Sequence, residues 1–317
     1  MALEPYNARK VVIIGAGKVG SHCALCLMFN HLVNEIVFLD VNEEAAWAQC
    51  ADLNDLASGI GDRFEIRVGT YDDCADAHFI IMTAGRSRRP GETRLEMLES
   101  MKGVLGSIVD GIKSSGFEGI LISISNPSDI VVEYLYRQLG LPRGRVFGTG
   151  TSLDSARLRR IVAERIGADP KQIQAFVMGE HGDSSFIPTS HVSIGGIPLR
   201  EYLKIRPQVG RLDWDEITQE VRAAGGRIVA GKGSTEFGIG SMASDLITAI
   251  LHDEKRVMPL AVHLDGEYGE SGIAAGTPCI VGDQGIEEVL ELDLSYDEEQ
   301  AMRSSCAIIR SNVAGLD

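Results

Sequence analysis

The stretch KVVIIGAGKVGSHCALCLMFNHLVNEIVFLD, residues 10–40, decides the fold of this 317-residue chain. Its β-branched run VVII is typical of a parallel strand that is buried on both faces. Glycines follow at once: Gly15 permits a tight turn, Gly17 lets a pyrophosphate approach the backbone, and Gly20 lets the next helix pack closely on the strand. We expect that helix to begin near Lys18.

The N-terminus of this helix predicts an anion site, because its free N–H groups and its dipole favour negative charge. A second apolar strand, residues 36–39, ends in Asp40, twenty positions after the last glycine. A carboxylate there can accept both ribose hydroxyls and would repel a 2′-phosphate. The sequence therefore predicts NAD rather than NADP as cofactor, at a GAGKVG turn that includes Lys18 and Val19.

The charge balance argues against several classes of partner. Thirty basic and forty-five acidic side chains give a net charge of −15, which opposes binding to nucleic acid or to an anionic membrane. No apolar run approaches the ~18 residues of a membrane helix, and MALEPYNARK lacks a signal-peptide core. We expect a cytoplasmic protein whose anionic ligands are drawn by local basic clusters.

The six cysteines are scattered along the chain. Cys23 and Cys26 have the spacing of a metal or redox pair, but both fall inside the first predicted helix, without a cluster of Cys or His nearby in the sequence. We therefore interpret them as small buried residues rather than zinc ligands, and we predict no metal.

Strand and helix patterns alternate between residues 10 and 147. Helices are expected at residues 42–57 and 95–114, and further strands at residues 64–68, 78–83 and 119–123. This alternation predicts an α/β domain with a doubly wound parallel (Rossmann) sheet over residues 1–147.

A different pattern from residue 148 onward predicts a second, smaller mixed α+β domain over residues 148–317. Helices are expected at residues 153–166, 213–230 and 234–251 and from residue 295, and short strands at residues 174–178, 190–194, 257–264 and 278–281.

Six motifs in order resemble those of the L-lactate/L-malate dehydrogenase family. They are GAGKVG at 15–20, TAG at 83–85, PGETR at 90–94, SNPSDI at 125–130, GTGTSLDSARLR at 148–159 and GEHGDS at 179–184. The resemblance spans nearly the whole chain. It implies an oxidoreductase that transfers a hydride reversibly between NADH and a 2-keto acid, and a homo-oligomer, either dimer or tetramer.

Such a reaction needs a proton donor, a group that polarises the carbonyl and a clamp for the carboxylate. The resemblance assigns the proton donor to His181, with Asp154 as the carboxylate that orients its ring. Arg157 matches the clamp, since its guanidinium can grip a carboxylate through two parallel hydrogen bonds. Arg94 matches the polarising arginine, on a loop that closes over substrate and expels water.

The resemblance implies further contacts that are less specific as sequence signals. Asn126 matches the residue between the nicotinamide and the substrate oxygen, although Asn-Pro also marks turns. Thr235 matches a hydroxyl beside the substrate and Ile239 an apolar wall behind the nicotinamide, and both are equally compatible with ordinary helix positions. The remaining implied cofactor contacts are Thr83, Ala84 and Gly85.

Arg88 occupies the family's selector position, where lactate dehydrogenases typically carry glutamine and malate dehydrogenases arginine. A buried guanidinium facing the methyl group of pyruvate would be unpaired, whereas oxaloacetate supplies a second carboxylate. We therefore expect oxaloacetate/L-malate. The alternative is L-lactate dehydrogenase or a broader 2-hydroxy-acid dehydrogenase, because PGETRLEM, GTGTSLDSARLR and Thr235 resemble the lactate branch. If Arg88 faces solvent, Arg86 or Ser87 would face the substrate instead.

Many bacterial lactate dehydrogenases are activated by fructose 1,6-bisphosphate through an arginine and a histidine. Arg159 matches the arginine, but Gln174 stands where the histidine is expected. We therefore predict weak or absent activation.

Two other classes remain as hypotheses. A non-catalytic NAD-binding protein would have no need for Asp154, Arg157, His181 and Arg94 together. An NAD-dependent glycosidase would need a metal site, for which the sequence offers no ligand cluster.

Overall fold

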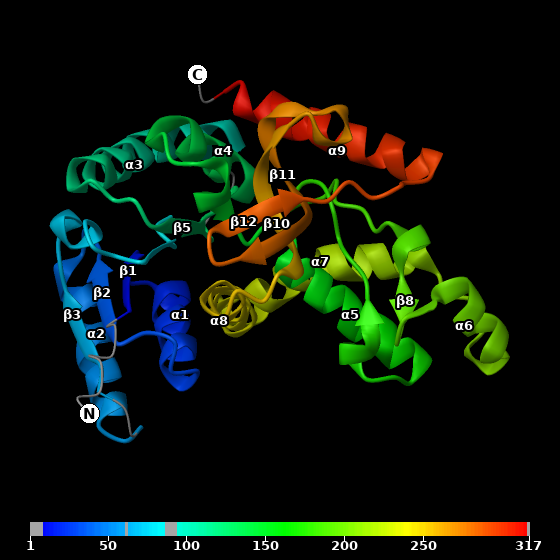
Figure 1. Cartoon of the computed structure of the whole chain (residues 1–317), viewed down its shortest axis with the longest axis horizontal. Coiled ribbons are helices and arrows are strands. Elements are labelled where there is room, and N and C mark those ends of the chain that lie inside the picture. Colours follow the sequence, from blue (N-terminus) through cyan, green and yellow to red (C-terminus); the bar gives the residue numbers. More distant parts are fainter. Residues whose placement is uncertain (1–8, 61–62, 86–93, 316–317) are drawn as a thin grey trace.

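The computed structural model describes residues 9–60, 63–85 and 94–315, with the backbone alone for residues 94–100. The described residues form a nine-stranded sheet with helices on both faces (Figure 1) and a separate three-stranded sheet. The strand order of the large sheet is β12-β11-β10-β6-β5-β4-β1-β2-β3.

Six strands of the large sheet are parallel, in the order β3-β2-β1-β4-β5-β6. Their bounds are β1 Lys10–Ile14, β2 Glu35–Leu39, β3 Glu65–Val68, β4 Phe79–Met82, β5 Ile120–Ser123 and β6 Val146–Gly148. The order reverses between β1 and β4, and the crevice outside the carboxyl ends of the strands at such a point is where α/β sheets bind ligands. The prediction of a doubly wound Rossmann sheet is confirmed.

Both faces of β1 are covered, which explains its unbroken apolar sequence. Val11 and Ile13 belong to one core and Val12 and Ile14 to another, because successive side chains point to opposite faces. The first core includes residues of α1 (Lys18–Phe29), α2 (Glu43–Ala57) and α8 (Phe237–Leu251), and the second those of α3 (Arg94–Ser115) and α4 (Ser128–Leu139). Asn42 is the N-cap of α2, and its side chain accepts from the Ala45 amide at 3.1 Å.

Three antiparallel strands continue the same sheet: β10 Arg256–Asp265, β11 Ser271–Gly282 and β12 Gly285–Val289. They join it where Ala261 of β10 pairs with Gly148 of β6. Strands β10 and β11 are longer than expected, and the sequence analysis did not identify β12. Helices α4 and α9 (Tyr296–Val313) pack on β11.

A further core lies in the C-terminal half, away from the large sheet. It includes residues of α5 (Ser152–Ile166), α6 (Leu199–Ile205) and α7 (Trp214–Lys232), and of β7 (Ile173–Gln174) and β8 (Ser193–Ile194) in the small sheet. Strand β9 (Ile197–Pro198) completes that sheet. The expected strand at residues 174–178 was wrong. Pairing in β7 ends at Gln174, and the chain turns so that Met178 bridges Phe186 and Gly179 bridges Gly276.

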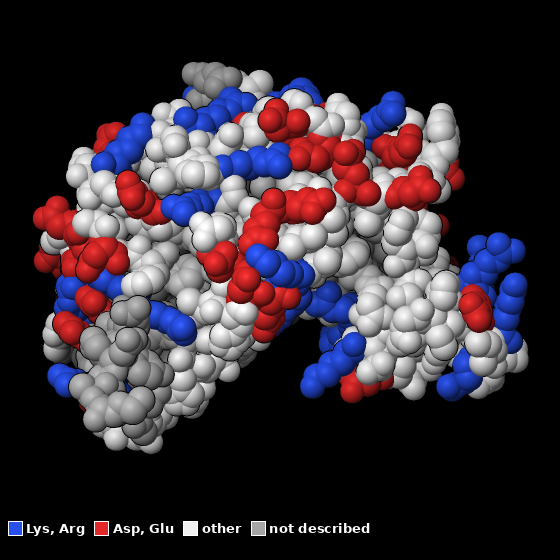
Figure 2. All heavy atoms as spheres, in the orientation of Figure 1, with Lys and Arg blue, Asp and Glu red and all other residues white. Residues whose placement is uncertain are grey.

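The surface carries both signs of charge. On the face in Figure 2 the acidic and basic side chains are interspersed, and acidic side chains form the larger groups, over β11, β12 and α9. Among the described residues, none of the helices has the length and apolar character needed to cross a membrane.

Candidate active site

The glycine turn joins β1 to α1 with little room for side chains. Gly15 has a φ of +110°, and a Cβ there would lie 2.7 Å from Thr83 Oγ1, which donates to the Gly15 carbonyl at 2.9 Å. A Cβ on Gly20 would lie 2.1 Å from the Gly15 carbonyl oxygen, so only glycine allows α1 to approach the strand this closely.

Asp40 lies at the end of β2, beside this turn. Its Oδ2 accepts the Ala16 amide at 2.7 Å, and its Oδ1 accepts the Asn42 amide at 2.9 Å. A Cβ on Gly17 would meet no atom within 4 Å, so the space outside the turn is open. The residues present therefore fit NAD: Gly17 and the start of α1 would face its pyrophosphate, and Asp40 would face a ribose.

A cavity of about 290 Å³ opens next to the turn, between α1, β5 and the helices of the C-terminal half. It brings together residues that are far apart in the sequence. Those singled out by the sequence analysis are Val19, Asn126, Asp154, Arg157, His181, Thr235 and Ile239.

His181, Asp154 and Arg157 form a connected group in this cavity. The Asp154 carboxylate binds His181 Nδ1 through Oδ2 at 2.6 Å and accepts from Arg157 Nη1 through Oδ1 at 2.8 Å. Because Asp154 occupies Nδ1, Nε2 is the ring nitrogen that can donate to a substrate oxygen. Arg157 lies one turn beyond Asp154 on α5, and only 11% of its side chain is exposed.

Burial and charge act in opposite directions on this group. Burial by itself favours the neutral ring, but the negative charge of Asp154 and its hydrogen bond raise the pKa of His181 above its ordinary value. Burial also opposes the charged form of Asp154, yet the nearby charges of His181 and Arg157 and their hydrogen bonds lower its pKa. The arrangement favours an imidazolium–carboxylate pair that can give up one proton.

The loop that carries His181 is held by its backbone. The amide of His181 donates to Asp129 Oδ2 at 2.8 Å, and the amide of Glu180 donates to Ser305 Oγ at 2.7 Å. The sequence analysis quoted Asp129 within SNPSDI but gave it no role. The motif itself gives no sign that Asp129, at the start of α4, contacts the His181 loop about fifty residues further along the chain.

Helix α7 supplies one wall of the cavity, which the sequence analysis also missed. Arg222, Gly225 and Val229 face the cavity from this helix. A Cβ on Gly225 would lie 3.6 Å from both Nη atoms of Arg157, so this wall lies directly beside the predicted carboxylate clamp. The helical pattern of residues 213–230 predicted the helix but not which neighbour it covers.

The predicted substrate loop is only partly described. Gly85 is the last described residue before it, and Arg94 is the first residue of α3, with its side chain outside the described part. Arg88, Arg86 and Ser87 lie outside the described residues. Their roles, like those of the other predicted site residues, stay predictions.

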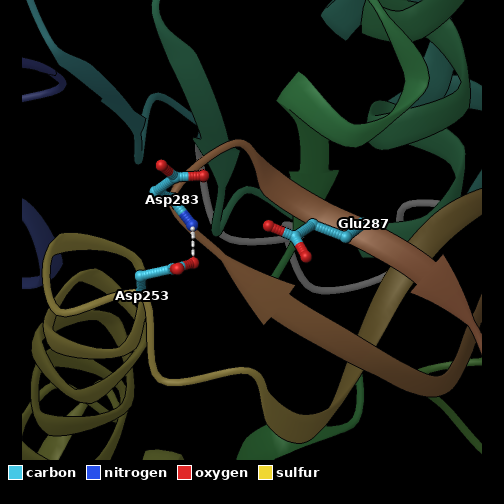
Figure 3. A group of neighbouring side chains, drawn as sticks. All are labelled: Asp253, Asp283 and Glu287. Atoms are coloured by element: carbon cyan, nitrogen blue, oxygen red, sulfur yellow. Dashed lines mark hydrogen bonds between the residues drawn. The ribbon is translucent and has the colours of Figure 1, made fainter.

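Among the described residues, one group of three carboxylates is close enough to be considered as a metal site: Asp253, Asp283 and Glu287 (Figure 3). The Nζ atom of Lys255 lies 2.7 Å from Asp253 and 2.5 Å from Glu287, and the Asp283 amide donates to Asp253 at 2.9 Å. This exposed group is therefore an ion-pair cluster in which the lysine already neutralises part of the acidic charge.

The two cysteines of α1 differ in burial: Cys23 is buried, as expected, whereas Cys26 is only partly buried. Cys23 is fully buried and both thiols are free. Burial raises the pKa of Cys23 to about 12, which disfavours the thiolate that metal binding or redox chemistry needs.

Comparisons with known proteins agree with this geometry. A family model described as the lactate/malate dehydrogenase NAD binding domain matches residues 9–148, and one described as the alpha/beta C-terminal domain of the same enzymes matches residues 151–315. L-lactate dehydrogenase 3 of Bacillus cereus is 40% identical over 305 residues, which is 96% of each chain. L-lactate dehydrogenase 1 of Bifidobacterium longum is 39% identical and covers 98% of each chain.

Solved structures extend the similarity to the arrangement of the fold. The minor L-lactate dehydrogenase of Enterococcus mundtii in its ligands-bound form has a TM-score of 0.94 at 35% identity, covering 98% of this chain and 99% of that one. The ligands-unbound form of the same enzyme has a TM-score of 0.87, with 98% of both chains covered. The present structure therefore resembles the ligands-bound arrangement more closely.

The Rossmann sheet, its glycine turn and the adjoining cavity define an NAD-dependent oxidoreductase that acts on 2-hydroxy acids. The chain belongs to the lactate/malate dehydrogenase family.

Proposed function

We propose that this protein reduces pyruvate to L-lactate with NADH, reversibly. The observation that carries the 2-keto acid chemistry is the contact of His181 Nδ1 with Asp154, beside Arg157, in a cavity next to the glycine turn. The choice of pyruvate rests on the relatives, several of which are L-lactate dehydrogenases at about 40% identity. They favour lactate over the malate preference that the sequence analysis drew from Arg88.

Bound NADH would supply the hydride, and the protein supplies the remaining functions. The Arg157 guanidinium binds the substrate carboxylate, which fixes the carbonyl with respect to His181. The His181 imidazolium donates a proton to the developing alkoxide, while Asp154 stabilises the charged ring. Arg94 polarises the carbonyl, Asn126 and Thr235 border the reacting end of the substrate, and Val19 and Ile239 give an apolar wall that excludes water from the nicotinamide face.

Oxaloacetate is the second candidate substrate, because Arg88 matches the malate-type selector. Steady-state kcat/KM with oxaloacetate, pyruvate and a branched 2-keto acid decides between them. We expect pyruvate to exceed oxaloacetate by about tenfold or more, the size of a single well-matched substrate contact. An advantage of that size for oxaloacetate would overturn pyruvate as the substrate and support Arg88 as a carboxylate ligand.

The role of Arg88 can be tested separately with Arg88→Gln. If its guanidinium faces the substrate, the substitution lowers kcat/KM for oxaloacetate and raises it for pyruvate, because the unpaired buried charge is removed. Arg86→Gln is the matched control on the same loop and should leave the ratio of the two substrates unchanged. A shift of that ratio by Arg86→Gln alone would assign the selector to position 86.

We also propose that the protein works as a homo-oligomer, a dimer or tetramer. Large apolar side chains are exposed on helices of one face of the sheet, among them Trp47 on α2 and Phe237 on α8, each 65% exposed. Burial of these side chains against a second copy would contribute to such association. Light scattering after size exclusion tests the assembly, and a monomer at assay concentration would contradict it.

A further inference from the structure

Asp129 is a buried carboxylate in the first turn of α4, and it contacts the loop of the candidate proton donor. It is 3% exposed, and its Oδ2 accepts the backbone amide of His181 at 2.8 Å. His181 is therefore bound by two carboxylates from different elements, with Asp154 of α5 on its ring and Asp129 of α4 on its backbone.

Three consecutive amides of this loop are fixed by three separate elements. Gly179 donates to the Gly276 carbonyl of β11 at 2.9 Å, Glu180 to Ser305 Oγ of α9 at 2.7 Å, and His181 to Asp129. Only the last of these contacts reaches a helix that follows directly on the Rossmann strand β5 and the cavity residue Asn126. Asp129 thus connects the position of His181 to the half of the molecule that holds the glycine turn.

The second oxygen of Asp129 faces a different environment. Among the residues that the structure describes, none donates a hydrogen bond to Oδ1, although this atom is buried. Burial raises the pKa of Asp129 to about 7, and the negative charge of Glu180 acts in the same direction, whereas the His181 amide and ring lower it. Burying a carboxyl group with one oxygen unpaired costs folding free energy. A role of Asp129 in the active site would explain why the group is placed there.

We propose that Asp129 is a positioning residue for the reaction: it fixes the backbone of His181 so that the imidazole meets both Asp154 and the substrate, and its negative charge favours the protonated ring. The proposal rests on the proposed function only in taking His181 as the proton donor. The charged groups that act on His181 are Asp154 and Arg157 from α5 and Asp129 from α4. Asp129 itself is faced by His181 and Glu180 from the His181 loop and by Cys306 of α9.

Two substitutions separate the geometric and the electrostatic parts. Asp129→Ala removes the acceptor, and we expect kcat to fall by roughly tenfold or more, since a displacement of about 1 Å at a reacting group costs up to ~10²-fold. Asp129→Asn keeps an oxygen for the His181 amide but removes the charge. It should retain more activity than the alanine variant, and the pH above which keto acid reduction declines should move lower. NADH affinity, measured by fluorescence, should stay unchanged in both.

Glu133→Gln is the matched control, because Glu133 is a fully buried carboxylate one turn further along α4. It accepts from Arg137 Nε at 2.6 Å and lies 2.8 Å from His263 Nδ1. This variant should lower thermal stability without changing kcat per folded site or the pH profile. If Asp129→Asn and Glu133→Gln have the same effects, or if folded Asp129→Asn keeps the wild-type pH profile, Asp129 has only a structural role and the proposal is overturned.

A readout without substrate keeps this test independent of the proposed function. Titration of the His181 ring, followed by NMR with labelled histidine and assigned with His181→Asn, should show a lower pKa in Asp129→Asn than in the wild type. An unchanged titration overturns the proposal. If the wild type reduces no 2-keto acid, the proposed function fails, and the ring titration still decides whether Asp129 acts on His181.

Discussion

Loss of the His181 imidazole should slow the chemical step without weakening cofactor binding. General acid catalysis contributes about 10²–10⁴-fold, so His181→Asn should lower kcat by that amount while NADH still binds. Rapid-mixing kinetics and NADH fluorescence measure the two properties. Asp40→Ala is the complementary variant and should weaken NADH chiefly; equal loss of both properties from either change would show that the two roles are misassigned.

The contact with Asp154 also sets a pH dependence with a definite sign. The pKa of His181 is raised, so the imidazolium that donates the proton persists above the ordinary range of histidine. Reduction of the keto acid should decline as pH rises through this raised pKa, whereas oxidation of the hydroxy acid, which needs the neutral ring, should increase. Asp154→Asn removes the charge and should move both transitions to lower pH, as profiles of kcat/KM would show. Transitions that stay in place would contradict the pairing.

Sequence patterns predicted those site residues whose arrangement depends on neighbours close in the chain. The sequence spacing of Gly15, Gly17 and Gly20 is enough to predict the turn before α1, and Asp40 follows the next strand. Asp154 and Arg157 share a helix face because they are three residues apart. Asp129 and Gly225 escaped notice because their importance comes from what the fold places opposite them, namely the His181 amide and the Arg157 guanidinium.

The two adjacent glycines of α7 offer a test at the level of one helix. A methyl group on Gly225 would lie in ordinary contact with Arg157 and take space from the cavity, whereas one on Gly226 would meet no atom within 4 Å. Gly225→Ala should therefore reduce kcat/KM for a branched 2-keto acid more than for pyruvate, and Gly226→Ala should change neither.

Both alanines remove a glycine from a helix interior, which favours the helix by about 0.5–1 kcal/mol. Thermal unfolding of the two variants should show this gain, most clearly for Gly226→Ala. Selective loss of the larger substrate in Gly226→Ala would show that the wrong face of α7 has been assigned to the cavity.

Elements with a strong local pattern were predictable, and those that depend on partners were not. The terminal helix has both halves of a capping box, with the Ser295 amide donating to Glu298 Oε2 at 2.9 Å, and its start was expected at Ser295. Strand β12 was missed because its residues, Gly285–Val289, alternate only weakly and form a strand by pairing with β11. For the same reason β7 ends at Gln174, where pairing with β8 ends.

For the whole molecule, we predict that fructose 1,6-bisphosphate has little effect. Arg159 is partly buried, and the negative charge of Asp245 on α8 acts on it, while Gln174 supplies no positive charge of its own. An anionic sugar phosphate would have to compete with Asp245 for one arginine on a chain of net charge −15. KM for the keto acid should be the same with and without the sugar phosphate, and a large decrease on its addition would refute this.

The division of the chain at residue 147 stays a prediction, and the pairing of Gly148 with Ala261 bears on it. A polypeptide that ends at residue 147 would lack β10, the neighbour of β6. The backbone amide and carbonyl groups at that edge would be unpaired, which favours aggregation. The complementary piece, residues 148–317, would keep the β10–β11 pair but lose the parallel strands that continue the same sheet. Expressing the two pieces together should therefore recover more folded material than expressing either alone.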